Sequence, residues 1–382
     1  MILVPLICLL APQNELPLAF ERVATHEGFL PSFVVAPTPQ PDFVCVVRKG
    51  DGAELRVLGT GRRAQELTHS GTDWFLNWAD FPAVARLAGG TTLAVWLVSD
   101  RQHEHSYGTR FQLFEQGKAV GEPQRLEAHS GAGEHGFVSL AVLDERRFLA
   151  LWLDGRAMDA HGKGEMQLLS RKVDADGTLG EEVLVDPSTC SCCPTDLARL
   201  PTGTFLAVWR DRGPDEVRDI AFATFDGKRW SEPKPVHVDG WKIPGCPVNG
   251  PRVDVDHLRV GVTWYTGVDG SVRACFGKPD GSSFAPPVRV DEGGAEGRGD
   301  GVLLPDGSFL VGWMAREEGR AAWWLRRVWP DGRLGEPYAL GEVAGSRDSG
   351  FLRLAVADGA AWALWTEPGA PPHVAVARMT FD

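Results

Sequence analysis

The chain of 382 residues is long enough for one large domain or for two or three ordinary ones. It contains 45 glycines, 27 prolines and 14 tryptophans, and this mixture of turn and aromatic residues is typical of many short strands joined by tight turns. The formal net charge is −12, the isoelectric point lies near 5.4, and no basic patch is present that would hold a phosphate backbone. We therefore expect an all-β protein and do not expect nucleic acid as a partner.

The N-terminus is apolar from Ile2 to Ala11. This stretch is too short to span a bilayer and is typical of the apolar region of a signal peptide. We predict a leader over residues 1–19, cleaved near Ala11 or Ala19, and a location in the periplasm or outside the cell. The alternatives are a lipoprotein signal at Cys8 and a first strand. No other segment is apolar for long enough to cross a membrane.

A strand-like phrase centred on tryptophan recurs along the chain. The phrases are TLAVWLVSD, FLALWLDGR, FLAVWRDRG, VGVTWYTG, FLVGWMARE and WALWTEP, around Trp96, Trp152, Trp209, Trp264, Trp313 and Trp365. The intervals are 49 to 57 residues, and a weaker copy, FVCVVRKG, comes first with Val46 in place of tryptophan. In each copy an apolar run precedes the phrase and further strands follow it. Four strands in about 50 residues, repeated, are the signature of propeller blades.

Seven copies predict a single β-propeller of four-stranded blades over residues 20–382, with six blades as the alternative if the first copy is not a full blade. The last copy offers only three strands, near 351–357, 361–366 and 373–381, whereas the segment 18–25 precedes the first copy and has no other role. We predict that this segment supplies the missing strand and closes the ring, which also removes exposed sheet edges. The six tryptophans are predicted to pack in the core between blades.

One face of the ring collects the unusual residues. Chain direction alternates from strand to strand, so the loops that lead into first strands and the loops that leave second strands lie on the same face, which we call the funnel face. Turns between third and fourth strands lie on the opposite face and carry ordinary Asp-Gly or Gln-Gly hairpin signals. A rigid scaffold that presents polar loops is where function is expected. The loops that lead into first strands contain Asp73, Asn77, Trp78, Asp80, Glu134, His135, Asp196, Trp241, Asn249, Arg298, Asp300, Arg347 and Asp348.

Two loops that leave second strands are also rich in charge: SDRQHEHS, which begins at Asp100, and RDRGPDEVRD, which begins at Arg210. Arginine forks bind carboxylates in a bidentate manner, so the second loop predicts a ligand clamp. The alternative is an internal salt-bridge network that braces the loop. The candidate residues of this loop are Arg210, Asp211, Arg212 and Arg218.

Four of the seven cysteines are predicted to be neighbours in space. Cys8 falls in the predicted leader, and Cys45 and Cys275 fall inside strand patterns, where buried thiols are expected. The others lie in the funnel-face loops of the adjacent fourth and fifth copies. They are Cys190, Cys192, Cys193 and Cys246.

Three chemistries fit this cysteine set. Disulfides are the default in an oxidising compartment, either from one of the first three cysteines to Cys246 or between the adjacent residues Cys192 and Cys193. The second is a thiolate metal site that binds copper or zinc, with His135 as a further candidate ligand. The third is a nucleophilic thiol, although no histidine is obviously placed to activate one. No cofactor is expected outside the metal alternative.

The turns DGKRW at 226–230 and DGSSF at 280–284 look like degenerate Asp boxes. Through them the chain resembles the sialidase-like (BNR-repeat) propellers over nearly all of its predicted mature length. The motifs CSCCPT, RDRGPDEVRDI and GCPVNGP look like those of a bacterial subgroup with this label and no established activity. The resemblance implies the fold and suggests action on acidic sugars. True sialidases use an arginine triad, a tyrosine–glutamate pair and an aspartate, and are usually six-bladed; here only Tyr265, after the fifth-copy tryptophan, is expected to reach the funnel.

Two functions remain open beside a purely structural ring. One is a glycan-active hydrolase that acts on acidic sugars at the central funnel, which needs two carboxyl groups or a substitute nucleophile. The other is a non-catalytic propeller that binds a ligand, glycan or metal through disulfide-stapled loops. We expect a monomer with a small molecule or glycan as partner. The candidate catalytic residues are Asp196, Asp211, Glu134 and Tyr265. The candidate ligand-binding residues are Arg210, Arg212, Arg218, Asn249, Arg298, Asp300, Arg347 and Asp348.

Overall fold

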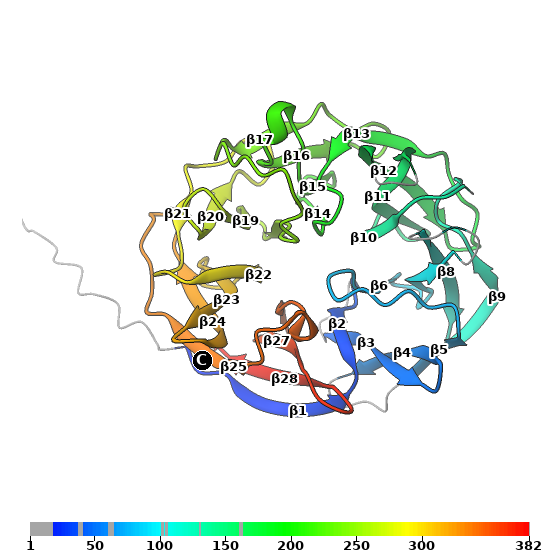
Figure 1. Ribbon diagram of the computed structural model, residues 1–382, viewed down its shortest axis with the longest axis horizontal. Helices are drawn as coiled ribbons and strands as arrows, with labels where there is room; N and C mark the ends of the chain where they lie inside the picture. The colour runs from blue at the N-terminus through cyan, green and yellow to red at the C-terminus, as the bar shows by residue number, and fades with distance from the viewer. Residues whose placement is uncertain are drawn as a thin grey trace, which may run out of the picture.

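A computed structural model shows seven four-stranded antiparallel sheets arranged as a ring around a central axis (Figure 1). The structure describes residues 18–36, 41–59, 65–100, 103, 106–129, 131–159 and 163–381. The copy without a tryptophan forms a complete sheet, so the prediction of a seven-bladed propeller is confirmed and the six-bladed alternative is wrong.

The first six blades run in chain order from the innermost to the outermost strand. Blade 1 consists of β2 (Phe29–Phe33), β3 (Asp42–Lys49), β4 (Gly52–Gly59) and β5 (Gln65–Gly71). Blade 2 consists of β6 (Ala83–Arg86), β7 (Thr92–Ser99), β8 (Tyr107–Glu115) and β9 (Lys118–Gln124). Blade 3 consists of β10 (His135–Val142), β11 (Arg147–Met158), β12 (Gly164–Asp174) and β13 (Val183–Thr189).

The second half of the ring follows the same order. Blade 4 consists of β14 (Asp196–Arg199), β15 (Phe205–Arg210), β16 (Ile220–Phe225) and β17 (Lys234–His237). Blade 5 consists of β18 (Arg252–Val255), β19 (Val260–Thr266), β20 (Ser271–Gly277) and β21 (Val288–Arg289). Blade 6 consists of β22 (Ala295–Leu303), β23 (Phe309–Glu317), β24 (Arg320–Val328) and β25 (Tyr338–Val343). Two short 3-10 helices, η1 (Pro214–Glu216) and η2 (Arg347–Ser349), lie in funnel-face loops.

Blade 7 is built from both ends of the chain. It consists of β26 (Arg353–Ala357), β27 (Ala360–Glu367), β28 (His373–Thr380) and, as its outermost strand, β1 (Glu21–Glu27). β1 pairs antiparallel with β28, so the predicted closure of the ring by an N-terminal strand is confirmed (Figure 1). The predicted leader, with Cys8, lies almost wholly outside the described residues and stays a prediction. Within the described ranges, no helix has the length and apolar character that a membrane span requires.

The second strand of each blade forms the core. The six repeated tryptophans are all buried there, and Val46 takes the equivalent place in β3. Trp152 and Trp209 have no exposed surface, and each indole N–H donates to a buried aspartate, Asp154 and Asp186 respectively. The predicted packing role of the tryptophans is confirmed, because large aromatic side chains bury the most apolar surface between sheets.

Neighbouring blades are joined near the axis by aspartates of the funnel face. Each carboxylate accepts a hydrogen bond from a backbone N–H of the next blade, which fixes the angle between the two innermost strands. The four bonds run to Asp80 from Phe137 N (2.7 Å), to Asp196 from Val253 N (2.9 Å), to Asp254 from Leu303 N (2.7 Å) and to Asp300 from Leu354 N (3.0 Å).

Candidate functional site

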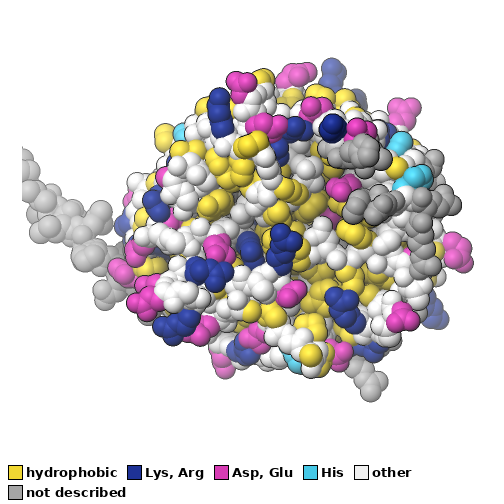
Figure 2. Space-filling model, viewed as in Figure 1, with side chains coloured by type: hydrophobic (Ala, Val, Ile, Leu, Met, Phe, Trp, Pro, Cys, Tyr) yellow, Lys and Arg dark blue, Asp and Glu magenta, His cyan; other side chains and the backbone are white. Residues whose placement is uncertain are grey.

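A cavity of about 220 Å³ lies on the propeller axis, lined by the first residues of the innermost strands. Two arginines line it, Arg252 at the start of β18 and Arg353 at the start of β26. Figure 2 shows basic side chains near the middle of this face, among hydrophobic ones. Four aspartates, Asp80, Asp196, Asp254 and Asp300, line the same cavity, so it brings groups of both charge signs together on the axis.

Arg353 is buried, with 7% of its surface exposed, and its guanidinium lies 4.1 Å from the centre of the Phe81 ring. No described residue accepts a hydrogen bond from its Nη1, nor from the buried Nη2 of Arg252. Burial, and next the charge of Arg252, lower the pKa of Arg353 to about 9, so the side chain is still charged at neutral pH. Buried donors are normally paired, so these two unpaired donors mark the cavity as a place for an acceptor.

Two further arginines stack on one tryptophan beside this cavity. The guanidinium of Arg298 in β22 lies 4.8 Å from the centre of the Trp78 ring, and that of Arg347 in η2 lies 5.8 Å away. Trp78 also stacks on Phe351, and the Phe351 ring lies 5.8 Å from the guanidinium of Arg353. Three of these arginines therefore lie against connected aromatic rings from blades 2 and 7, and Arg252 shares the axial cavity with Arg353. We call the four together the arginine cluster. They are Arg252, Arg298, Arg347 and Arg353.

Asn249 positions Arg298. Its amide oxygen accepts from the backbone N–H of Arg298 (2.8 Å), and its amide nitrogen donates to the carbonyl of Glu296 (3.1 Å). Gly297 lies at φ +75°, and a Cβ there would stand 2.3 Å from the Asn249 amide oxygen, so only glycine allows this approach. Both the oxygen and the nitrogen of the Asn249 amide, predicted to bind ligand, are thus hydrogen-bonded within the protein.

The aspartates on the axis join neighbouring blades by hydrogen bonds, and burial raises the pKa of several of them. Asp196, predicted to be catalytic, and Asp300, predicted to bind ligand, both line the cavity while they join blades. Burial raises the pKa of Asp254 and of Asp80 to about 7, against hydrogen bonds that favour the charged forms, and burial also raises the pKa of Asp300. Carboxyl groups that keep a proton near neutral pH are the kind that serves as a general acid.

Arg210, predicted to bind ligand, does not join the arginine cluster. It is fully buried, and each of its three nitrogens donates to a backbone carbonyl, of Asn249, Arg218 and Tyr265. Its guanidinium also lies 4.8 Å from the centre of the Trp241 ring.

The rest of the RDRGPDEVRD loop is braced internally. Glu216 accepts from Arg212 and from Arg218, at 2.6 Å in each case, and these two bonds lead the causes that lower its pKa to about 2. Of the two alternatives for this loop, the structure contains the salt-bridge network. Asp211, predicted to be catalytic, lies in the same loop, where burial, and then the charge of Asp186, raise its pKa to about 6.

The remaining predicted residues are dispersed over the face. Tyr265 contacts Trp241 edge to face and lines a small cavity with Arg252 and Arg298. Asp348 is exposed and lines a cavity of about 230 Å³ with Trp78. Their predicted roles in catalysis and ligand binding stay predictions.

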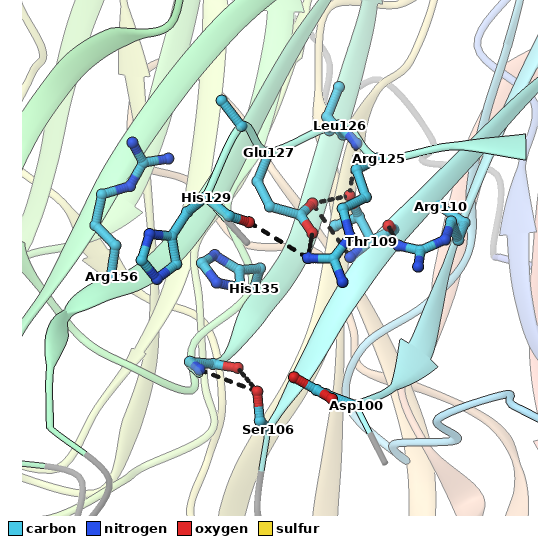
Figure 3. Close-up of polar contacts among 12 residues, drawn as sticks. Asp100, Ser106, Thr109, Arg110, Arg125, Leu126, Glu127, His129, His135 and Arg156 are labelled. Atoms are coloured by element: carbon cyan, nitrogen blue, oxygen red, sulfur yellow. Dashed lines mark hydrogen bonds and ion pairs between the residues drawn. The ribbon is translucent and has the colours of Figure 1, made fainter. Parts of the chain in front are cut away.

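His135 lines a second pocket, between blades 2 and 3, and Glu134 precedes it in the chain. This pocket has a volume of about 520 Å³ and is lined by Tyr107, Arg110, Arg125 and His135, among others. The side chain of Glu134 is hydrogen-bonded to Tyr107, and His135 lies 3.2 Å from buried Asp154. Figure 3 shows His135 near His129 and Arg156, with Glu127 between Thr109 and Arg125. Asp196 lines the axial cavity, whereas Glu134 lines neither that cavity nor this second pocket.

The four loop cysteines do converge, as predicted. Cys192 and Cys246 form a disulfide with a Cα–Cα distance of 6.0 Å, whereas Cys190 and Cys193 are free and buried. A bond between Cys192 and Cys193 is therefore not the pairing observed. Burial opposes ionisation of Cys190, but hydrogen bonds from the Cys193 thiol and the Cys192 backbone, with the charges of Arg210 and Arg218, lower its pKa to about 6. His135 is not part of the metal-capable group that these cysteines form.

Sequence reasoning missed Arg252 and Arg353. A signal was present, since each opens an apolar first strand, in PRVDV and FLRLAV, at the register where blade 4 has Asp196. A charge in that register points to the axis, and only the repeat alignment reveals it.

No family model and no curated protein matches the chain in sequence. Solved structures match it in fold. A protein of unknown function from Dyadobacter fermentans has a TM-score of 0.55 and 14% identity, covering 81% of this chain and 97% of its own. A polysaccharide lyase has a TM-score of 0.54 and 10% identity, covering 94% and 100%, and a Hadza microbial sialidase has 0.51 and 13%, covering 86% and 73%. The protein thus shares the β-propeller fold of these structures.

Proposed function

We propose that the protein binds carboxylate-bearing sugars at the centre of the funnel face, through the arginine cluster and Trp78. The observation that carries this proposal is the buried Arg353, whose unpaired Nη1 shares the axial cavity with the unpaired Nη2 of Arg252. A planar carboxylate offers two oxygens that accept from guanidinium nitrogens, and such charge-assisted bonds are the strong ones. The fold shared with a sialidase and a polysaccharide lyase supports a sugar as the class of ligand.

Trp78 supplies the other half of sugar recognition. Its ring is half-buried on the funnel face and lines an adjoining cavity of about 230 Å³ with Asn77 and Thr366. Aromatic rings beside a few polar groups are typical of small-molecule sites, and the ring gives an apolar surface to pack on while the arginines select charge. A neutral sugar gains only the first of these interactions.

Cleavage of the bound sugar is the second candidate function. It is favoured by one observation, the two axial carboxyl groups whose pKa burial raises to about 7, Asp80 and Asp254. A protonated carboxyl group in the same cavity as the arginines is placed to donate to a leaving oxygen.

The test is calorimetric titration of the purified chain with sialyllactose and with a galacturonate trimer, beside neutral lactose as the control ligand. We expect the acidic sugars to bind at least tenfold more tightly than lactose, and Arg353→Met and Arg298→Ala to abolish this preference. Arg333→Ala is the matched control variant, because Arg333 also stacks on a tryptophan, Trp329, but follows a third strand on the opposite face. Equal affinity for lactose, or unchanged affinity in both funnel variants, would contradict the proposal.

A parallel assay separates binding from cleavage. Release of sugar from the same acidic ligands, reduced at least a hundredfold in Asp254→Asn while binding is retained, would establish the second candidate. Binding without release by the wild type would rule it out.

A further inference from the structure

Three of the four loop cysteines bring their sulfur atoms to the spacing of metal ligands. The Sγ atoms of Cys190, Cys192 and Cys193 all lie within 4.8 Å of one another, and Cys190 and Cys192 are 3.9 Å apart. Cys246 is bonded to Cys192 and so adds a fourth sulfur. A tetrahedral ion with metal–sulfur bonds of about 2.3 Å holds its sulfurs about 3.8 Å apart. The three sulfurs are therefore close to the spacing of ligands around one ion, and Cys246 is available as a fourth ligand once its disulfide is opened.

The backbone holds this sulfur cluster in place before any ligand binds. The N–H of Cys190 donates to the carbonyl of Arg210 (3.0 Å), which ties the blade 4 loop to the end of β15. On the other side, Gly250 approaches Pro194 so closely that a Cβ would stand 1.8 Å from the Pro194 carbonyl oxygen. Two loops from adjacent blades are thus locked together around the sulfurs.

The donor set and the surrounding charges select the kind of ion. Among the described residues, the metal-capable group contains sulfur donors alone, and soft thiolates favour zinc or copper(I) over hard cations. Arg210 and Arg218 lie close enough to Cys190 for their charges to act on it. These positive charges offset the negative charge that several thiolates bring to one ion.

The four cysteines differ in exposure to solvent, and this difference sets the order in which a reagent reaches them. Cys246 is exposed and Cys192 is half-buried, whereas Cys190 and Cys193 are buried beneath them. A reagent from solution therefore meets the disulfide first and the free thiols second.

We propose that these four cysteines bind one thiophilic ion, zinc or copper(I), after a dithiol reductant has opened the Cys192–Cys246 disulfide. A thiolate of the reductant attacks the exposed Cys246 sulfur, forms a mixed disulfide and releases the Cys192 thiolate. The second thiol of the reductant closes its own disulfide and releases the Cys246 thiolate, so the reductant loses two electrons and the protein gains them. The ion then binds the four sulfurs, and the remaining thiol protons pass to solvent.

The experiment uses the full mature chain in two states, oxidised and reduced with a dithiol that is then removed under argon. Each state is titrated with zinc and, separately, with copper(I) against a chromophoric competitor. We expect one ion per reduced chain, no stoichiometric binding by the oxidised chain, and at least a hundredfold loss of affinity in Cys190→Ser and Cys193→Ser. Cys45→Ser and Cys275→Ser are the matched controls, since both are buried free cysteines inside strands, and they should bind as the wild type does.

X-ray absorption on the metal-loaded wild type keeps the proposal testable if the serine variants do not fold. Sulfur scatterers alone, four around zinc or three to four around copper(I), are the expected result. Nitrogen or oxygen scatterers in the majority, failure of the reduced chain to bind either ion, or equal binding by the oxidised chain would overturn it. Because the funnel variants do not touch these cysteines, either proposal can fail without the other.

Discussion

Two buried arginines on the same face of this propeller have opposite environments. Arg210, 1% exposed, donates from all three nitrogens to backbone carbonyls of blades 4 and 5. Arg353, 7% exposed, keeps a nitrogen for which no described residue is an acceptor, and it lines a cavity with a second arginine. Both stack on aromatic rings, so burial and stacking do not distinguish them.

The difference suggests a criterion: an arginine whose donors are all hydrogen-bonded within the protein is structural, whereas one with unpaired donors is available to bind a ligand. A guanidinium whose donors are all paired holds loops together, and its loss leaves several carbonyls unpaired in a buried place. A guanidinium with unpaired donors beside a cavity carries a desolvation penalty that a ligand can relieve. Four experiments test this distinction, beginning with the largest expected effect.

Arg210→Met should destabilise the protein most. The substitution leaves the carbonyls of Asn249, Arg218 and Tyr265 without their donor, and we expect the free energy of unfolding to fall by about 3–5 kcal/mol. Urea denaturation followed by tryptophan fluorescence measures the change. Arg199→Met, at an exposed position in the same blade, is the control and should stay within about 0.5 kcal/mol of the wild type. A loss below 1 kcal/mol in Arg210→Met would show that paired donors do not make Arg210 structurally important.

Gly250→Ala should disturb the region around Arg210 from the other side. An alanine Cβ would overlap the Pro194 carbonyl, so the two loops must separate, and we expect a loss of about 2–4 kcal/mol. Alkylation of the native protein should then reach Cys190 and Cys193, which are buried in the wild type. Gly341→Ala serves as the control, because nothing lies within 4 Å of a Cβ at that site. Full protection of both thiols in Gly250→Ala would show that the contact does not hold the loops.

Asp80→Asn tests how an aspartate that joins two blades makes the stability of the protein depend on pH. The pKa of Asp80 in the folded protein is raised from 3.8 to about 7, so the folded state holds the proton more tightly than the unfolded state. Its contribution to stability is therefore complete below about pH 4 and is lost as the pH rises to about 7. Asparagine keeps the acceptor for Phe137 and removes the titration, so the stability of the variant relative to the wild type should increase by about 2–4 kcal/mol between pH 4.5 and 8.

Asp51→Asn provides the matched control, since Asp51 is exposed in a turn of blade 1. Its stability relative to the wild type should be the same at both pH values. A flat difference for Asp80→Asn as well would mean that Asp80 is ionised throughout.

Arg353→Met should have the smallest effect on stability. It removes a buried charge with an unpaired donor and keeps most of the side-chain volume, so the free energy of unfolding should change by about 1 kcal/mol or less, in either direction. Denaturation beside Arg210→Met gives the direct contrast. A loss as large as that of Arg210→Met would show that Arg353 is structural and would remove the main support for the proposed sugar site.

The sequence by itself determined the ring. The tryptophan period, the three-strand last copy and the spare segment at 18–25 led to seven blades and to closure by β1, because burial of one large residue per second strand repeats at a fixed interval. It also brought the four cysteines together, since adjacent copies place equivalent loops side by side.

Only the tertiary structure decided what the charged residues do. Arg210 and Arg298 are both predicted to bind ligand on the funnel face. Arg210 instead donates to carbonyls from three segments of the chain, whereas Arg298 stacks on a tryptophan from blade 2. Asp196 and Asp300 join neighbouring blades, because the next blade presents a backbone N–H to each carboxylate. Hydrogen-bond partners of this kind lie about 50 residues or more away, and their geometry depends on the angle between blades, which no local pattern contains.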